Sequence, residues 1–317
     1  MLISVIIPTY NRAGILGKTL QAYADQNAHD QMLEMLVVDD GSNDQTRSVV
    51  EKCSRCFPAP LHYFHQQNQG LAAARNHAIR EAKGSILLFG DDDIMPSPHM
   101  ISEHAVWHQT HTEQSVGVLG YVTWAPEVRP TPFMEWAGMY GPQFNFGYFT
   151  PGMELGFQYG YFCNTSVKST FLRDNGIFNE SFRSYGWEDI ELSYRLGKKG
   201  YRLLYNPGAV GYHLKHERFE DTRRRIESLY ASWPTFAKTE AGEHFLEIWH
   251  IHTAGSARGM KAMVKKTLKP LKALAMPLLK PIIDTRLPLP NKIYDMVFYH
   301  YVTPFSVFIE KARQGSS

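Results

Sequence analysis

The stretch Ser85-Ile86-Leu87-Leu88-Phe89-Gly90-Asp91-Asp92-Asp93 runs from a buried-strand pattern directly into three carboxylates. Like charges at the end of a buried strand repel one another and are costly to desolvate, so they need a counter-charge. A divalent cation, Mg2+ or Mn2+, is the simplest candidate, because such ions prefer carboxylate oxygens. If the chain stays extended, Asp91 and Asp93 lie on one side and Asp92 on the other. The stretch therefore predicts a strand ending at a metal site that could hold a diphosphate.

Strand and helix patterns alternate over the first hundred residues. Strands are expected at residues 3–7, 35–38, 61–64 and 86–89, and helices at residues 15–26, 44–53 and 70–82. Apolar strands separated by helices indicate an α/β fold with a mostly parallel central sheet covered on both faces. Ligands of such sheets bind at the carboxyl ends of the strands. Three polar segments follow those ends, at residues 8–12, 39–42 and 91–93.

The overall charge is nearly balanced, with 33 Lys and Arg against 31 Asp and Glu. This balance argues against nucleic acid as a partner. No uninterrupted apolar segment approaches the length of a membrane-spanning helix. The three cysteines form no disulfide framework, which is typical of a reducing compartment. A cytoplasmic protein is therefore expected.

Two later segments allow two interpretations each. Residues 124–162 are rich in aromatic side chains, which either line a surface for an acceptor or pack a small core of their own. Residues 255–283 hold seven Lys and Arg and no acidic residue, interleaved with apolar residues. This basic tract predicts contact with an anionic membrane surface, and a solvated helix face or an oligomer contact is the alternative.

Four histidines, at positions 99, 104, 108 and 111, fall within one predicted helix. His104 and His108 are one turn apart, which invites a zinc interpretation. The His-Glu-x-x-His order is absent and the sequence indicates no third ligand. A structural role in the helix is therefore expected.

Five motifs occur in a diagnostic order along the chain. They are Pro8-Thr9-Tyr10-Asn11-Arg12, Asp39-Asp40-Gly41-Ser42, Asn68-Gln69-Gly70-Leu71-Ala72-Ala73-Ala74-Arg75-Asn76, the triplet at 91–93, and Gly186-Trp187-Glu188-Asp189. Together they closely resemble the family 2 glycosyltransferases, over about residues 2–217. The resemblance implies the GT-A fold, in which a Rossmann-like nucleotide-binding half is fused to an acceptor-binding half.

The resemblance implies these domain limits: a glycosyltransferase domain at residues 1–217, divided into a nucleotide-binding half (1–123) and an acceptor and catalytic half (124–217). Residues 218–317 lie outside it. They are expected to form a mostly helical C-terminal extension that carries the basic tract.

The resemblance also implies residue roles. The residues implied to bind the nucleotide are Pro8, Thr9, Tyr10, Arg12, Asp39, Asp40, Arg75, Asp91 and Asp92. A carboxylate at 39 or 40 suits a base such as uracil, whose ring N–H is a donor, although residues 40–44 also fit a turn that caps the next helix. Asp91 and Asp93 match the metal-binding pair, and His213 matches a further metal ligand, with His216 close enough to compete.

Asp189 matches the catalytic base of the family, and Glu188 beside it is implied to contact acceptor or donor. Trp136, Tyr161 and Trp187 are candidates for acceptor binding. The resemblance implies an inverting, Mn2+- or Mg2+-dependent transfer of a hexosyl or N-acetylhexosaminyl group from a nucleotide sugar, with UDP expected, to a glycan, lipid-linked or protein acceptor. Two alternatives remain: transfer to a polyprenyl phosphate, and a non-catalytic sugar-nucleotide or glycan-binding module.

Overall fold

The structure is a computed structural model that describes residues 2–27, 32–141, 144–245 and 269–301. It divides into two compact units. Unit 1 comprises residues 1–129 and 146–215, and unit 2 comprises residues 130–145 and 216–317. Each unit has a hydrophobic core of its own. About half of the basic tract, residues 255–268, lies outside the described residues.

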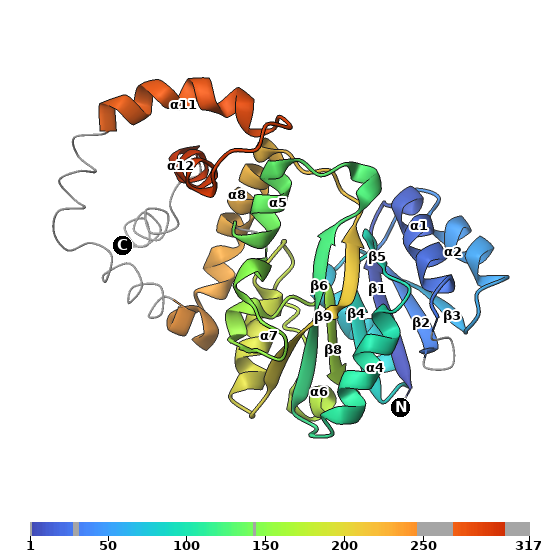
Figure 1. Ribbon diagram of the computed structural model, residues 1–317. Coiled ribbons are helices and arrows are strands. Elements are labelled where there is room, and N and C mark those ends of the chain that lie inside the picture. Colours follow the sequence, from blue (N-terminus) through green and yellow to red (C-terminus); the bar gives the residue numbers. More distant parts are fainter. Residues whose placement is uncertain (1, 28–31, 142–143, 246–268, 302–317) are drawn as a thin grey trace. The chain divides into compact units, whose positions relative to one another are not determined.

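Unit 1 is built on one mixed sheet (Figure 1). Its strands are β1 (Ile3–Thr9), β2 (Met32–Asp39), β3 (Leu61–His65), β4 (Ile86–Gly90), β5 (Ile94–Pro96), β6 (Val116–Trp124), β7 (Glu154–Leu155), β8 (Asn164–Lys168) and β9 (Arg202–His213). The order is β3-β2-β1-β4-β8-β6-β9-β5, and β7 pairs with β9. The first four strands are parallel, as the sequence predicts.

The second half of the sheet departs from this parallel pattern. β8 runs antiparallel between β4 and β6, while β9 pairs parallel with β6. Strand β8 is not expected from its sequence, because four of its five residues are polar, yet all five are buried. β9 brings His213 to the same edge as the triplet, opposite Ile94 in β5.

Helices cover the sheet of unit 1. They are α1 (Ala13–Ala24), α2 (Thr46–Ser54), α3 (Leu71–Glu81), α4 (Met100–Thr110), α6 (Ser169–Asn175) and α7 (Glu188–Gly197), with short 3-10 turns η1 (Pro126–Val128), η2 (Phe146–Tyr148) and η3 (Phe157–Tyr159). One core joins alternate residues of β1 and β4 to apolar residues of α1, α2 and α4. The sheet is thereby held rigid behind its polar edge.

The histidines of α4 face this buried region. His104 Nε2 bonds Asn164 Oδ1 at 2.9 Å, and His104 Nδ1 bonds Ser166 Oγ at 2.7 Å. His108 Nε2 bonds the same hydroxyl at 2.8 Å. Both rings are fully buried, and burial lowers the pKa of His104 to about 4 and that of His108 to about 3. These two histidines therefore bind β8 to α4 as neutral rings.

Unit 2 packs helices around a separate core. They are α5 (Pro132–Met139), α8 (Phe219–Phe236), α11 (Lys269–Ile283) and α12 (Asn291–Tyr301). Trp136 of α5 stacks on Tyr294 of α12, with ring centroids 5.6 Å apart, and Phe133 meets Phe219 at 5.9 Å. Within the described residues, no helix is both long enough and apolar enough to cross a bilayer.

Candidate functional site

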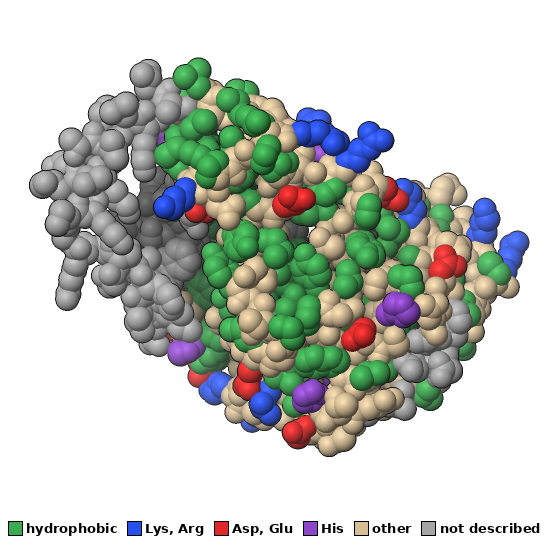
Figure 2. All heavy atoms as spheres, viewed as in Figure 1, with side chains coloured by type: hydrophobic (Ala, Val, Ile, Leu, Met, Phe, Trp, Pro, Cys, Tyr) green, Lys and Arg blue, Asp and Glu red, His purple; other side chains and the backbone are tan. Residues whose placement is uncertain are grey.

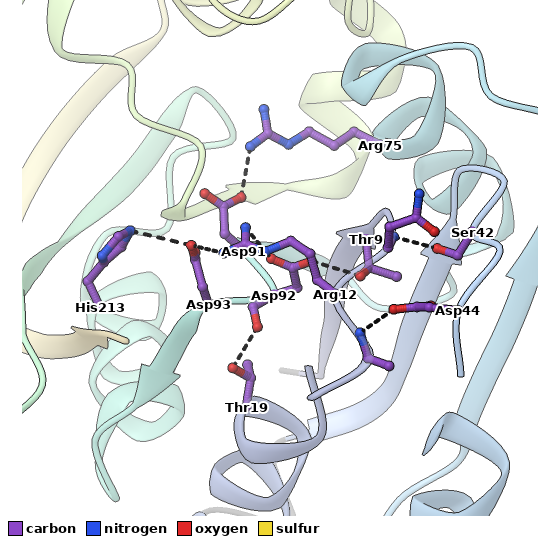
Figure 3. A network of polar contacts seen from close by, with 12 residues as sticks. Thr9, Arg12, Thr19, Ser42, Asp44, Arg75, Asp91, Asp92, Asp93 and His213 are labelled. Atoms are coloured by element: carbon purple, nitrogen blue, oxygen red, sulfur yellow. Dashed lines mark hydrogen bonds and ion pairs between the residues drawn. The ribbon is translucent and has the colours of Figure 1, made fainter. Parts of the chain in front are cut away.

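The loops after β1 and β4 meet at the aspartate triplet (Figure 3). Asp91, Asp92 and Asp93 form a turn, because Ile94 N–H donates to the carbonyl oxygen of Asp91 at 3.3 Å. The expectation that Asp91 and Asp93 lie on one side and Asp92 on the other assumed an extended chain, so it does not apply to this turn. Asp92 and Asp93 share Arg12 as a partner, whereas Asp91 pairs with Arg75.

Asp92 is held by the loop after β1. Thr9 donates its hydroxyl to Asp92 Oδ2 at 2.7 Å, and Thr19 of α1 donates to the Asp92 carbonyl at 2.8 Å. Arg12 bridges Asp92 Oδ1 at 2.9 Å and Asp93 Oδ2 at 2.6 Å. The sequence predicted a cation as the counter-charge of the triplet. The structure adds Arg12, whose guanidinium spans two of the three carboxylates.

Asp93 and His213 offer two donors for a divalent cation. Asp93 Oδ2 lies 3.6 Å from His213 Nε2. Burial works to raise the pKa of Asp93, but the positive charges of His213 and Arg12 outweigh it and lower that pKa. Two ligands about 2.0–2.2 Å from one ion lie roughly 3–4 Å apart, so this pair fits a shared cation. His216, the competing candidate, begins unit 2.

A cation at this pair would depend on further ligands from outside the protein. In the described part of the chain, no group of three or more His, Cys, Asp or Glu side chains has a metal-holding arrangement. Oxygen-rich ligands such as phosphates commonly complete the coordination of Mg2+ and similar ions. The donor set therefore fits a metal that binds together with a phosphorylated ligand.

Arg75 is the centre of the other half of the site. Its side chain is 2% exposed, and its guanidinium lies 2.5 Å from Asp189 Oδ1 and 3.2 Å from Asp91 Oδ1. It also donates to the carbonyl of Phe162 at 3.0 Å and lies 5.3 Å from the ring centroid of Phe178. Burial alone would lower the pKa of Arg75, but the surrounding carboxylates raise it. Arg75 thus remains charged and joins the triplet to α7.

The chain enters α7 through a strained turn. Gly186 and Trp187 both have positive φ, 97° and 74°. This conformation is uncommon for an aromatic residue, and such outliers cluster at functional sites. The turn puts Glu188 and Asp189 in the first turn of α7, where the helix dipole favours negative charge.

Glu188 and Asp189 differ in their surroundings. Glu188 is buried, and burial together with the charge of Asp189 raises its pKa to about 8. Asp189 also has a pKa raised by burial, but it accepts bonds from Arg75 and from Phe162 N–H at 3.1 Å. Asp189 is therefore the better stabilised anion of the pair. Its side chain remains 23% exposed, so a ligand can reach it.

Asp39 and Asp40 shape the neighbouring loops. Asp39 accepts bonds from Ser42 N–H at 2.8 Å and from the Tyr63 hydroxyl at 2.7 Å. Asp40 accepts from Gln66, Gln69 N–H and Gly70 N–H, all at 2.8–2.9 Å. Both carboxylates therefore support the loops around β2, and base recognition by either stays a prediction.

Asp44, the last residue of the predicted turn, has partners in two loops. Asp44 Oδ1 accepts from Thr46 N–H at 3.0 Å at the start of α2, whose N-cap position is Gln45. Asp44 Oδ2 accepts from Ala13 N–H at 3.0 Å at the start of α1. One carboxylate thus ties the loops after β1 and β2 together.

The remaining predicted residues are divided among several places. Pro8 is buried at the end of β1, whereas Tyr10, directly after that strand, is 47% exposed. Tyr161 and Trp187 belong to unit 1, with Trp187 largely buried. Trp136 is buried in the core of unit 2, where packing accounts for its position. Acceptor binding by these three aromatic residues stays a prediction.

The structure also reveals partners that no motif indicated. The backbone of Phe162 bonds both Arg75 and Asp189, and Tyr63 bonds Asp39. Phe162 is 87 residues from Arg75 in the chain. A backbone contact over that distance leaves no local sequence signal.

Solved structures with the same architecture come from glycosyltransferases. A mannosyltransferase from Pyrobaculum calidifontis, in complex with GDP-Man and Mn2+, aligns with a TM-score of 0.58 at 21% identity, over 93% of this chain and 85% of that one. S. aureus TarS 1–349, in complex with UDP-GlcNAc, aligns with a TM-score of 0.57 at 20% identity, over 99% and 92%. The fold of unit 1, with the aspartate triplet and His213 at one edge of its sheet, is a GT-A glycosyltransferase architecture.

The sequence comparisons narrow this class to a family. The model of glycosyl transferase family 2 matches residues 4–163. The chain is a member of glycosyl transferase family 2. It is 26% identical over 258 residues to the glycosyltransferase YfnE of Bacillus subtilis (strain 168), and 27% identical over 269 residues to validoxylamine A glucosyltransferase of Streptomyces hygroscopicus subsp. jinggangensis (strain 5008).

These relatives are longer proteins. The matches cover 67% and 75% of this chain, but only 64% and 60% of YfnE and of the glucosyltransferase, respectively. The chain thus spans less than two thirds of the length of either relative.

Proposed function

We propose that this glycosyltransferase is a divalent-metal-dependent, inverting enzyme that transfers a hexosyl or N-acetylhexosaminyl group from a UDP-linked sugar. The observation that carries the proposal is the buried contact of Arg75 with both Asp91 and Asp189. It joins the carboxylates proposed to serve the donor to the carboxylate proposed to act as base. The two parts of a transfer site therefore form one rigid network.

Asp189 is proposed to accept the proton of the acceptor hydroxyl as that oxygen attacks the anomeric carbon. A general base must be ionised and within reach. The guanidinium of Arg75 and the N–H of Phe162 stabilise the ionised form and fix its orientation, while partial exposure leaves it accessible. Glu188, whose pKa is raised by burial and by the charge of Asp189, is proposed to hold a proton and to donate it in a hydrogen bond to the sugar donor or to the acceptor.

Asp93 and His213 are proposed to hold Mn2+ or Mg2+. When bound, the ion would supply positive charge that stabilises the leaving nucleoside diphosphate. Arg12 already contacts Asp92 and Asp93, so it adds a second positive group at the same edge. Complexes of two neighbours in fold, with GDP-Man and Mn2+ and with UDP-GlcNAc, support a nucleotide-sugar donor here.

The nucleotide is proposed to lie along the loops after β1 and β2. Thr9, Tyr10, Asp39 and Asp40 lie in or beside those loops, and Asp39 retains acceptor capacity beyond its two bonds. A uracil ring N–H could use that capacity. The acceptor is proposed to be a glycan, a lipid-linked sugar or a protein, met on the cytoplasmic side of a membrane.

The test is calorimetric binding of UDP, GDP and dTDP, each with Mn2+, with Mg2+ and with EDTA. UDP with Mn2+ or Mg2+ should bind most tightly, and EDTA should weaken it. Asp93→Asn should remove the metal-dependent gain, whereas the control Asp174→Asn, an exposed aspartate of α6, should keep it. UDP affinity that ignores both EDTA and Asp93→Asn would contradict the metal assignment.

A panel of UDP-linked sugars then identifies the sugar. The cognate donor should be hydrolysed slowly without an acceptor, because water can replace the acceptor hydroxyl at Asp189. Hydrolysis of only GDP-linked or dTDP-linked sugars would contradict the proposed UDP donor.

A further inference from the structure

We propose that residues 284–292, which form the turn between α11 and α12 and the first two residues of α12, contact the surface of an anionic lipid bilayer. This proposal concerns unit 2 alone and is independent of the proposed catalytic roles. It rests on three features of the described residues: exposed leucines, a backbone with few unpaired donors, and flanking cations.

The exposed leucines differ from the other apolar residues of these helices. Leu287 is 58% exposed and Leu278, in the second half of α11, is 70% exposed. In contrast, Met276, Ile283 and Tyr294 are almost completely buried in the core of unit 2. The helices therefore have their core contacts already, and both leucines are additional to them. Hydrophobic side chains gather over the second half of α11 in the space-filling view (Figure 2).

Residues 287–290 of the turn have no unpaired backbone N–H group, which lowers the cost of placing them in a medium without water. Pro288 and Pro290 have no N–H group. Leu287 N–H donates to Thr285 Oγ1 at 3.3 Å, and Leu289 N–H donates to the Tyr294 hydroxyl at 3.2 Å. An unpaired donor is costly among lipid chains. From 287 to 290, every backbone N–H is thus absent or bonded within unit 2.

The charged residues around this segment indicate that the bilayer it contacts is anionic. Arg286 and Lys292 are exposed at the two ends of the apolar segment. By sequence, residues 255–317 hold 11 Lys and Arg against 3 Asp and Glu, whereas residues 1–254 hold 22 against 28. The basic residues are therefore concentrated in this end of the chain. A bilayer rich in anionic lipid attracts such residues and accepts partly inserted leucines.

The test is cosedimentation of the full chain with vesicles of phosphatidylcholine, alone or mixed with phosphatidylglycerol. The chain should bind the mixed vesicles. High salt should release it, because the Debye length, over which charges attract one another, shortens to about 3 Å at 1 M salt. Leu287→Ser should weaken binding about tenfold. Arg286→Gln and Lys292→Gln should weaken it about fivefold each.

Matched controls come from unit 1. Val106→Ser changes an apolar residue of α4 that is 49% exposed, and Lys199→Gln changes an exposed lysine after α7. Neither should alter vesicle binding. Thermal unfolding should be unchanged in all of these variants, since each changes an exposed side chain.

Two results would overturn the proposal. One is equal binding, or none, to anionic and neutral vesicles at low salt. The other is a Leu287→Ser protein that binds vesicles normally but loses self-association in light scattering, which would assign the turn to a contact between two copies of the chain.

Discussion

Unit 1 contains two buried polar clusters that lie on the same sheet but are built in opposite ways. The charged cluster surrounds the end of β4, where Asp91, Asp92 and Asp93 face the guanidinium groups of Arg12 and Arg75 (Figure 3). Two further carboxylates, Glu188 and Asp189, pair with Arg75. The neutral cluster joins α4 to β8 through His104, His108, Asn164 and Ser166.

The neutral cluster satisfies nearly all of its polar side-chain atoms; among the described residues of the cluster, His108 Nδ1 alone is buried without a hydrogen-bond partner. Asn164 donates its amide to the carbonyls of Tyr121 and Ala209, so its oxygen must accept from His104 Nε2–H. His104 Nδ1 then accepts from the Ser166 hydroxyl, whose oxygen accepts from His108 Nε2–H. Each bond fixes the direction of the next. No charge is needed, which suits a cluster that only holds helix and strand together.

The charged cluster has more negative groups than positive ones, and burial raises the pKa of four of its five carboxylates. The pKa values of Asp91, Asp92 and Glu188 rise to about 6, 7 and 8, and that of Asp189 is also raised. Such a cluster opposes folding unless it gains a further cation or a proton. The difference between the clusters supports the binding and catalytic roles proposed for the charged one.

The largest expected effect is on the rate of transfer, when the proposed base of the charged cluster is replaced. Asp189→Asn keeps the size of the side chain and its contact with Phe162 N–H but cannot accept a proton. Transfer should fall by about 10²–10⁴ while donor affinity changes little. The measurement is the rate of transfer at saturating donor, together with calorimetric donor binding.

Asp174→Asn is the matched control for this substitution, since Asp174 is exposed and lies on α6, which follows the end of β8 that pairs with the start of β4, whereas the triplet follows the other end of β4. If Asp189→Asn transfers at the normal rate, the acceptor must need no base. A phosphate nucleophile, as in a polyprenyl phosphate, would then become the preferred acceptor.

The sequence predicted the charged cluster better than the neutral one. The triplet, Arg12, Arg75 and Glu188-Asp189 all belong to motifs, and the structure brings them together at one sheet edge. The direct partners of Arg75 were not predictable. Its contact with Asp189 spans 114 residues, and the resemblance implied a nucleotide or diphosphate partner instead.

Strand β8 shows why the neutral cluster escaped prediction. Its sequence, Asn164-Thr165-Ser166-Val167-Lys168, is polar and resembles a loop, yet every residue is buried. The polar groups are satisfied by residues far away in the chain, including the histidines of α4 and the carbonyls that Lys168 reaches after that helix. Burial of this kind depends on tertiary partners, so local hydrophobicity cannot indicate it.

The next largest effect tests whether Arg75 stabilises its cluster. Arg75→Met leaves Asp91 and Asp189 without their buried counter-charge, so the free energy of unfolding should fall by about 3–5 kcal/mol. Arg80→Met is a control on the same helix, because Arg80 pairs with Glu180 at the surface and should contribute less than about 1 kcal/mol.

Denaturant unfolding at neutral pH measures both variants. Arg75→Lys keeps the charge but loses the planar fork, so an intermediate loss is expected. Equal stability of Arg75→Met and Arg80→Met would contradict the role given to Arg75.

A smaller effect is expected from the neutral cluster, as a loss of stability at low pH. The pKa of His104 falls from its ordinary value near 6.5 to about 4 on folding, so the unfolded chain binds protons more readily between these values. Its contribution to stability should be complete above about pH 6.5, and roughly 3 kcal/mol should be lost as the pH falls to about 4.

Unfolding measured across this range tests the neutral cluster. His104→Gln, whose amide can replace the Nε2–H donor, should be less stable at neutral pH but should lose this part of the acid sensitivity. His99→Gln, at an exposed histidine before α4, should keep it. Identical pH profiles for wild type and His104→Gln would mean that His104 is not held neutral by the fold.

The smallest expected effect has the opposite sign and comes from Glu188. Its pKa is raised on folding to about 8, so the folded chain binds a proton that the unfolded chain releases above its ordinary pKa near 4.5. The contribution of Glu188 to stability should therefore increase as the pH falls, by about 1 kcal/mol between pH 7 and pH 6.

Glu188→Gln should flatten this dependence of the free energy of unfolding on pH. The loss of stability that comes from His104 should then be measured on its own. Glu154→Gln, at an exposed carboxylate paired with Arg202, is the matched control and should leave the slope as in the wild type. A Glu188→Gln protein with an unchanged slope would show that Glu188 is already ionised in the folded state, and the proton-donating role proposed for it would fail.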